Sequence, residues 1–363
     1  MMKVRKEYLK ETKSYAAHTP ESTPNTLDCS QGVNPYGPPE SALQAIRNFD
    51  PARVTAYPHS HAVHSAVIRY WHDFADLNPE NILLADGSIS ALYLVNALFA
   101  APDAQVVGFM PTFTDMVVSV GLNGMKYIGI PPADADYRLD VNAMLDAIHE
   151  KTSFVYIDNP NNPTGQLLPV SEIERIVKKA KQCDACVLID EAYADFVDKS
   201  DSAMPLLTKY DNLIVLRTFS KGFGLAGLRA GYLVASPELV GLMAKASNPY
   251  TMNELTREAA AAAMSAVGYP TAHQKQISSV KEALRGVCGH SLTMLVTDDR
   301  VPICTLKHKD AVDLQALLCR QDILTVSGVE FDCMDASCVR LRVPREEETE
   351  RLIRAVRKVD MGE

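Results

Sequence analysis

The sequence has little positive charge and no long apolar run. Its 36 Lys and Arg residues are outnumbered by 45 Asp and Glu residues, which gives a formal net charge of −9 at pH 7. A negative surface does not favour contact with nucleic acid or with anionic lipid, and no basic run offers a local exception. No segment approaches the roughly 18 consecutive apolar residues of a membrane-spanning helix. We therefore expect neither a nucleic-acid partner nor a membrane partner.

Regular cysteine spacing is also missing. The chain has eight cysteines in 363 residues, without the repeated intervals of a disulfide framework. Cys183 and Cys186 form a Cys-x-x-Cys pair, but no second pair completes a zinc site. The N-terminus, 1–13, is charged where a secretory signal would have an apolar core. We expect a cytoplasmic protein with reduced thiols and no metal.

Short aliphatic runs separated by amphipathic segments dominate the first two thirds of the chain. Their near-continuous apolar character is typical of strands buried on both faces of a mainly parallel sheet. In the segment 171–183, apolar residues recur at i, i+3, i+4 and i+7, which predicts a crossover helix. Ser171 and Glu174 predict a capping box at its start. The predicted strands are 81–84, 105–109, 125–130, 153–157, 185–189, 213–216 and 231–235.

The pattern changes after about residue 245. An alanine-rich helix is expected over 255–267, followed by amphipathic helix to about residue 287. Shorter strands and a final helix follow, a mixture typical of a smaller α+β domain. These elements are expected over 292–296, 303–306, 339–343 and 346–359. We expect a large domain over 46–245, and a small domain formed by 246–363 with the N-terminal segment 1–45, which packs on it or reaches a partner subunit.

The most informative motif follows the predicted strand 213–216. Thr218, Ser220 and Lys221 lead into a glycine-rich stretch that ends at Arg229. A lysine at the end of a buried strand is desolvated, which makes its amine a nucleophile toward aldehydes. Hydroxyl and guanidinium groups are the side chains expected around a phosphate. A lysine beside a phosphate cradle predicts a pyridoxal 5'-phosphate (PLP) site, although the motif alone also fits an exposed lysine in a loop.

Polar or aromatic residues follow other predicted strands. Asp190 can pair with a pyridinium nitrogen, or cap a helix. Asn162, in a proline-flanked turn, can hold a phenolate oxygen, although such residues are common in turns. Gly87 and Ser88 open a helix whose N–H groups attract phosphate, and Phe113 can stack on a ring. Because ligands in open α/β sheets gather at the carboxyl ends of strands, one ligand can reach all of these residues.

With these motifs in order and at similar spacing, the sequence resembles the fold-type I PLP enzymes, in the branch of the histidinol-phosphate aminotransferases and threonine-phosphate decarboxylases. The resemblance covers nearly the whole chain and implies a PLP-dependent transferase fold and a homodimer with shared active sites. It is carried by Asn159-Pro160-Asn161-Asn162-Pro163-Thr164-Gly165, by Asp190-Glu191-Ala192-Tyr193, and by Ser220-Lys221-Gly222-Phe223-Gly224-Leu225-Ala226-Gly227-Leu228-Arg229.

The resemblance also implies roles around the cofactor. Lys221 would bond PLP and move the substrate Cα proton, and Asp190 would bind the pyridinium nitrogen. Asn162 and Tyr193 would bind the ring oxygen. Tyr57 would reach the phosphate in the neighbouring subunit. Phe113 would stack on the ring, and the phosphate would be held by Gly87, Ser88, Thr218, Ser220 and Arg229.

On the substrate side, the resemblance implies that Arg340 binds a carboxylate, with Arg342 as the alternative. Asn34 and Tyr36 lie in a segment similar to one that closes over substrate. Relatives that take phosphorylated substrates carry an arginine where Val326 stands here, so we expect a donor with an α-carboxylate and no phosphate.

The function implied is an aminotransferase that passes an amino group from an amino acid to a keto acid such as 2-oxoglutarate. Three alternatives use the same cofactor: a decarboxylase similar to threonine-phosphate decarboxylase, another tailoring reaction of an amino acid, and a histidinol-phosphate aminotransferase. A regulatory protein with the same fold would need a DNA-binding domain, for which residues before 30 leave no room.

Overall fold

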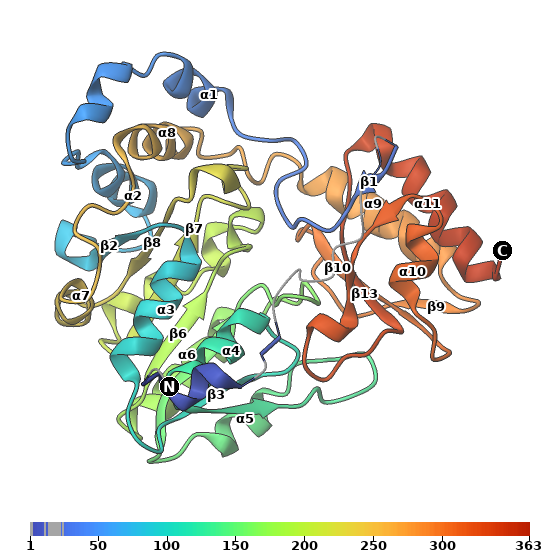
Figure 1. The fold of residues 1–363 in the computed structure, drawn as a ribbon, viewed down its shortest axis with the longest axis horizontal. Coiled ribbons are helices and arrows are strands. Elements are labelled where there is room, and N and C mark those ends of the chain that lie inside the picture. The colour runs from blue at the N-terminus through green and yellow to red at the C-terminus, as the bar shows by residue number, and fades with distance from the viewer. Residues whose placement is uncertain (1–2, 11, 14–22, 24) are drawn as a thin grey trace.

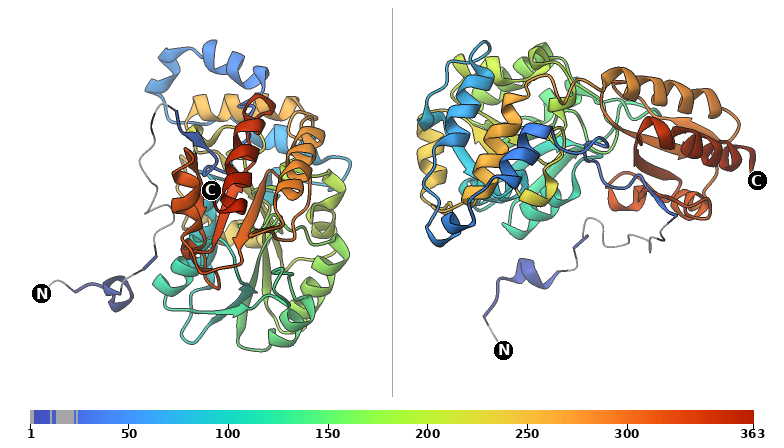
Figure 2. Two further views of the ribbon diagram at one scale, coloured as in Figure 1. Left: turned by 90° about the vertical axis from the view of Figure 1, so that its right-hand side faces the viewer. Right: turned by 90° about the horizontal axis from the view of Figure 1, so that it is seen from above.

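A computed structural model of the chain describes residues 3–10, 12–13, 23 and 25–363, and it has two lobes (Figure 1). The larger lobe is built on a seven-stranded sheet, and the smaller one, which contains the C-terminus, on a four-stranded sheet. Figure 2 shows the two lobes from two further directions, with the small lobe in front in the left-hand view. Within the described ranges, no helix is long and apolar enough to cross a bilayer.

The sheet of the large lobe has the strand order β2-β8-β7-β6-β5-β3-β4. All of its strands run in one direction except β8, which is antiparallel to both neighbours. Each strand lies within two residues of a predicted one, so the mainly parallel seven-stranded sheet is confirmed. The strands are β2 (Ile82–Ala85), β3 (Gln105–Phe109), β4 (Lys126–Ile130), β5 (Thr152–Asp158), β6 (Cys186–Asp190), β7 (Leu213–Thr218) and β8 (Gly231–Val234).

Helices cover both faces of this sheet, as Figure 1 shows. In β5, Val155 and Ile157 belong to one hydrophobic core, whereas Phe154 and Tyr156 belong to the other. Successive side chains of a strand point to opposite faces, so a strand buried on both sides is apolar throughout. The first core includes α2 (Ala62–Trp71), α5 (Val141–Ala147), α6 (Val170–Lys181) and α8 (Glu254–Ser265), and the second includes α3 (Ser88–Phe99), α4 (Thr114–Leu122) and α7 (Pro237–Ala244).

The crossover helix α6 is present with its predicted apolar stripe fully buried. The predicted capping box between Ser171 and Glu174 is wrong. The helix begins at Val170 with Pro169 as its N-cap, and no side chain caps it. Pro169 has φ −60° and ψ 146°, an extended conformation suited to an N-cap, but its side chain has no acceptor for a helix N–H. Glu174 instead accepts a hydrogen bond from the Tyr210 hydroxyl at 2.8 Å.

The small lobe is an α+β unit. Its antiparallel sheet has the order β12-β13-β10-β9. A separate parallel pair, β1 (Leu27–Asp28) with β11 (Ile323–Leu324), fastens the N-terminal segment to this lobe. The remaining elements are β9 (Leu292–Met294), β10 (Ile303–His308), β12 (Val326–Ser327), β13 (Cys338–Arg342), α9 (Gln274–Val287), α10 (Leu314–Cys319) and α11 (Glu346–Met361).

The chain does not pass between the lobes at the expected limits of 46 and 245. Helix α8 follows residue 245, but its Ala260 and Ala263 lie in a core of the large lobe. Helix α1 (Glu40–Arg47) begins before residue 46 and packs on α8. An alanine-rich helix carries no signal for which lobe it covers, because its small side chains fit either. Part of the expected segment 1–45 lies outside the described residues.

Candidate active site

A cavity of about 230 Å³ lies at the carboxyl ends of β5, β6 and β7. Ligands in open α/β sheets bind at this edge, where parallel strands end together. Asp158 and Asp190 are the last residues of β5 and β6, and Thr218 ends β7. The structure brings these predicted residues around the cavity: Ser88, Phe113, Asn162, Asp190, Tyr193, Thr218, Ser220, Lys221 and Arg229.

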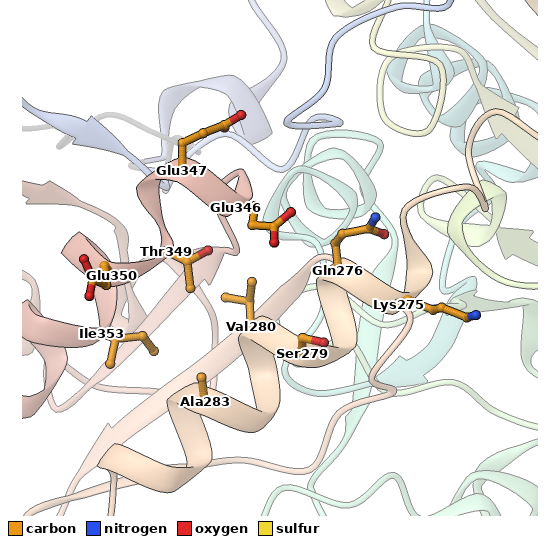
Figure 3. Close-up of a pocket in the computed structure, with 10 residues that line it drawn as sticks. All are labelled: Lys275, Gln276, Ser279, Val280, Ala283, Glu346, Glu347, Thr349, Glu350 and Ile353. Atoms are coloured by element: carbon orange, nitrogen blue, oxygen red, sulfur yellow. The ribbon is translucent and has the colours of Figure 1, made fainter.

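A larger cavity of about 680 Å³ lies between α9 and α11 of the small lobe (Figure 3). Glu346 from α11 points toward Gln276 from α9, whereas Lys275 points away from α11. It contains none of the predicted residues and lies away from the carboxyl edge of the large sheet. We therefore take the smaller cavity as the candidate active site, because the predicted polar residues converge on it and none of them lines the larger one.

One end of the smaller cavity is built to hold an anion. The Thr218 hydroxyl donates to Ser220 Oγ at 3.0 Å, and Arg229 Nη1 donates to the same oxygen at 3.4 Å. Gly87, the N-cap of α3, has φ +81°, and a Cβ there would run into the Arg229 guanidinium. Ser88 is the first residue of that helix, whose N-terminus attracts negative charge. Hydroxyls, a guanidinium and a helix N-terminus together form a phosphate cradle.

Lys221 lies next to this cradle, just beyond β7. Its Nζ is 5.7 Å from the centre of the Tyr193 ring. Burial raises the pKa of Tyr193, which therefore keeps its hydroxyl proton. The backbone N–H of Asn34 donates to the Lys221 carbonyl at 3.0 Å, and Asn34 Nδ2 donates to the Gly222 carbonyl at 2.8 Å. Asn34 therefore fixes the backbone that carries the lysine.

Asp190 forms the buried floor of the cavity. The Tyr156 hydroxyl donates to Asp190 Oδ2 at 3.1 Å, and the Ala192 N–H donates to Oδ1 at 3.1 Å. Burial, with a further contribution from the nearby Asp158, raises the pKa of Asp190 to about 7. A carboxylate in this setting favours a positive group from a ligand. A protonated pyridine nitrogen is such a group.

The small lobe contributes an arginine to the same place. Arg340, in β13, is 1% exposed, and its Nη1 donates to Asn162 Oδ1 at 3.1 Å. It also donates to the Ser30 carbonyl. Arg342 donates instead to the carbonyls of Gln31 and Val343, both at 3.0 Å. Of the two arginines considered from the sequence, Arg340 is thus the one in contact with a residue that lines the cavity.

Other predicted residues lie outside the cavity wall. Tyr57 is 67% exposed and stacks on Tyr250, with 4.2 Å between ring centres. Tyr36 stacks on His273 at 3.6 Å. Val326 is paired directly with Arg340 between β12 and β13. Directly opposed residues of antiparallel strands share a face, so an aliphatic side chain lies beside the guanidinium.

Sequence reasoning missed Asp158 and Tyr156. Asp158 lines the cavity, and Tyr156 hydrogen-bonds Asp190 from the neighbouring strand. The alternation of side chains along β5 was the available signal, because Tyr156 and Asp158 share one face of a strand that runs beside β6. In the part of the chain that the structure describes, no group of three or more His, Cys, Asp or Glu side chains is arranged to hold a metal ion.

These features define a PLP-dependent enzyme of fold type I, since the cradle, the lysine and the buried carboxylate fit the phosphate, aldehyde and pyridinium of that cofactor. The family model for aminotransferase class I and II matches residues 24–356. The chain therefore belongs to the class I and II aminotransferases, and PLP is its cofactor.

Individual relatives agree with this family. A histidinol-phosphate aminotransferase of Mannheimia succiniciproducens is 35% identical over 245 residues, which cover 66% of this chain and 64% of the relative. Another, of Burkholderia pseudomallei, is 33% identical over 278 residues, which cover 76% of each. The chain thus spans about two thirds to three quarters of the length of these relatives.

Solved structures show the same fold. The histidinol-phosphate aminotransferase of Clostridium acetobutylicum superposes with a TM-score of 0.83 at 22% identity, covering 93% of this chain and 100% of that one. That of Sinorhizobium meliloti, in complex with pyridoxal 5'-phosphate, gives 0.79 at 23% identity, covering 93% and 91%.

Proposed function

We propose that the protein transfers the amino group of an α-amino acid to a keto acid such as 2-oxoglutarate. The observation that carries this proposal is that Lys221, just beyond β7, lines one cavity together with the phosphate cradle and the buried Asp190. The bound cofactor supplies an acceptor for the amino group and delocalises the negative charge left on Cα.

The chain's own residues divide the work. Lys221 Nζ would hold the cofactor until the amine of the donor displaces it, and the freed Nζ would then accept the proton from Cα of the donor. Asp190 pairs with the ring nitrogen, and Phe113 covers one face of the ring. Asn162 and Tyr193 hold the ring oxygen. Asn34 keeps the backbone of Lys221 in place through its two hydrogen bonds.

Arg340 binds the α-carboxylate of the donor in this proposal. Its guanidinium lies beside the cavity, where the planar fork matches a carboxylate with two parallel hydrogen bonds. Val326, opposite Arg340 in the sheet, offers no hydrogen bond to a phosphate. An unphosphorylated donor avoids leaving a doubly charged group beside an aliphatic side chain.

Histidinol phosphate is the second candidate donor. It is favoured by the relatives at 33–35% identity, which bear the name histidinol-phosphate aminotransferase. Histidinol phosphate has no α-carboxylate, so its use would require Arg340 to bind the phosphate instead.

A donor panel separates these candidates. The holoenzyme is incubated with 2-oxoglutarate and with single amino acids, histidinol phosphate or threonine phosphate, and glutamate, keto acid and CO₂ are measured together. We expect keto acid and glutamate from an unphosphorylated amino acid, without CO₂. Efficient turnover of histidinol phosphate would contradict the proposed donor class. Release of CO₂ without glutamate would identify a decarboxylase instead.

The lysine is tested by reduction of the holoenzyme with borohydride, followed by peptide mapping. We expect loss of the visible absorption band and a label on Lys221. Lys221→Ala should abolish turnover and labelling, whereas Lys245→Ala, an exposed lysine at the end of α7, should change neither. A label on another lysine would contradict the assignment of Lys221 as the residue that bonds the cofactor.

A further inference from the structure

The floor of the cavity contains a second carboxylate that the roles above do not use. Asp158 is the last residue of β5 and pairs in register with Asp190, the last residue of β6. Asp158 is 4% exposed and Asp190 is 5% exposed, and both line the cavity. Two buried acids therefore lie side by side at the point where the ring nitrogen of the cofactor is expected.

Asp158 is held by the turn that follows it. Its Oδ2 accepts the backbone N–H of Asn162 at 3.0 Å, and its Oδ1 accepts from Asn161 Nδ2 at 2.9 Å. Asn162 in turn accepts from Arg340 at 3.1 Å. Asp158 is thus connected to Asn162, which is proposed to hold the ring oxygen, and through Asn162 to Arg340, which is proposed to bind the substrate.

Two cations lie close to this pair. Lys221 lines the same cavity, and Arg340 donates to Asn162, whose backbone N–H bonds Asp158. The other titratable groups near the pair are Glu191 and the phenols of Tyr127, Tyr156 and Tyr193. Burial raises the pKa of Asp158 to about 6, partly offset by its hydrogen bonds. Two acids in a dry site repel each other when both are ionised, so the pair is stabilised by a cation.

We propose that Asp158 is a positioning residue for the cofactor ring, whose carboxylate adds a second negative charge behind Asp190 and fixes the turn that carries Asn162. This inference rests on the proposed PLP site. A second negative charge raises the pKa of the ring nitrogen further than Asp190 alone does. It also raises the pKa of the nitrogen that joins Lys221 to the cofactor, and the visible absorption band reports this second pKa.

A purely structural role for Asp158 is the alternative, and the two roles differ in what they shift. Asp158→Asn removes the charge and keeps one acceptor oxygen for the turn. Asn161→Ala, its matched control, removes the hydrogen bond between the turn and Asp158 and keeps the charge. Asp158→Ser, a second variant without charge, provides the measurement if the asparagine variant does not fold.

Three quantities are measured on each purified protein: the midpoint of the pH titration of the visible absorption band, the dissociation constant of PLP, and the thermal midpoint of the apoprotein. We expect Asp158→Asn to lower the titration midpoint by about one pH unit, the order expected for loss of one neighbouring opposite charge. We expect the dissociation constant to rise about tenfold. Asn161→Ala should leave the titration midpoint unchanged.

An unchanged midpoint in both Asp158→Asn and Asp158→Ser would overturn the inference. So would equal shifts in these variants and in Asn161→Ala, because the turn and not the charge would then be responsible. A wild-type protein that binds no PLP and shows no visible band would instead overturn the proposed site, so the two failures are distinguishable.

Discussion

At the scale of single residues, Asp190 serves the bound cofactor but lowers the stability of the apoprotein. Its pKa, raised by burial to about 7 from 3.8, means that the folded apoprotein keeps a proton that the unfolded chain releases. The free energy of unfolding of the apoprotein therefore falls as the pH rises from about 4 through 7, and it falls no further from this cause above that range.

Asp190→Asn should remove this cost. We expect the apoprotein variant to have the same thermal midpoint as the wild type near pH 4 and a higher one near pH 7.5. Each kcal/mol of added unfolding free energy should raise the midpoint by about 2–4 °C. The holoenzyme variant should lose roughly 100- to 1,000-fold in rate, because the charge on the ring is no longer stabilised. Asp146→Asn, at an exposed position of α5, is the control. A stability difference that does not depend on pH would contradict the argument.

Arg340→Lys tests the other charged residue of the site. An ammonium cannot reproduce the planar fork of a guanidinium on a carboxylate. We expect KM for the amino-acid donor to rise about tenfold or more, a loss on the order of 1–3 kcal/mol for a charged hydrogen bond. Arg342→Lys should have the smaller effect, since Arg342 bonds backbone carbonyls. Equal effects of the two variants on KM would leave the assignment to Arg340 without support.

At the scale of elements, Arg217 ties two strands together beneath the site. It lies in β7 and donates to Glu191 Oε2 at 2.5 Å and to Asp195, both of which follow β6. All three side chains are at most 3% exposed. The ends of β6 and β7, which carry Asp190 and Lys221, therefore share one buried ion network.

Removing the Arg217 guanidinium should be costly. Arg217→Met leaves two buried carboxylates unpaired, and we expect a loss of about 3–5 kcal/mol in unfolding free energy. Arg285→Met, which breaks a half-exposed pair with Asp299, should cost less than about 1 kcal/mol. Urea denaturation followed by circular dichroism measures both, and similar losses in the two variants would mean that the buried network is not special.

The sequence predicted the elements with strong local patterns and missed those made by distant pairing. The seven strands of the large sheet are apolar throughout because both faces are covered, and this pattern is visible without a structure. Strands β1, β11 and β12 are two residues long, too short for an apolar pattern, and β1 and β11 come from opposite ends of the chain. The alternation along β5 places Asp158 and Tyr156 on one face, but only the register between β5 and β6 shows that Asp158 lies beside Asp190.

At the scale of the whole molecule, Tyr57 is the predicted residue that most needs a second chain. It lies on the surface, 67% exposed, and Val54 nearby is 73% exposed. We propose a homodimer in which Tyr57 reaches the partner's phosphate cradle, because exposed apolar side chains gathered on one surface mark contact sites.

Mixing two inactive variants tests this arrangement. Tyr57→Phe and Lys221→Ala subunits, once exchanged, should recover activity, because each heterodimer has one site with both residues intact. Light scattering gives the oligomeric state, and tagged subunits verify exchange. Full activity of Tyr57→Phe alone, or no recovery after verified exchange, would argue against a shared site.

The N-terminal segment from residue 25 contacts the small lobe, the backbone that carries Lys221, and the large lobe in turn. Strand β1 pairs in the small lobe, Asn34 is bonded to the carbonyls of Lys221 and Gly222, and α1 packs on α8 of the large lobe. The segment thus links the small lobe to the large lobe through the backbone that carries Lys221. We expect any shift of one lobe relative to the other to displace this backbone, so that access to the cavity and the position of the lysine amine are coupled.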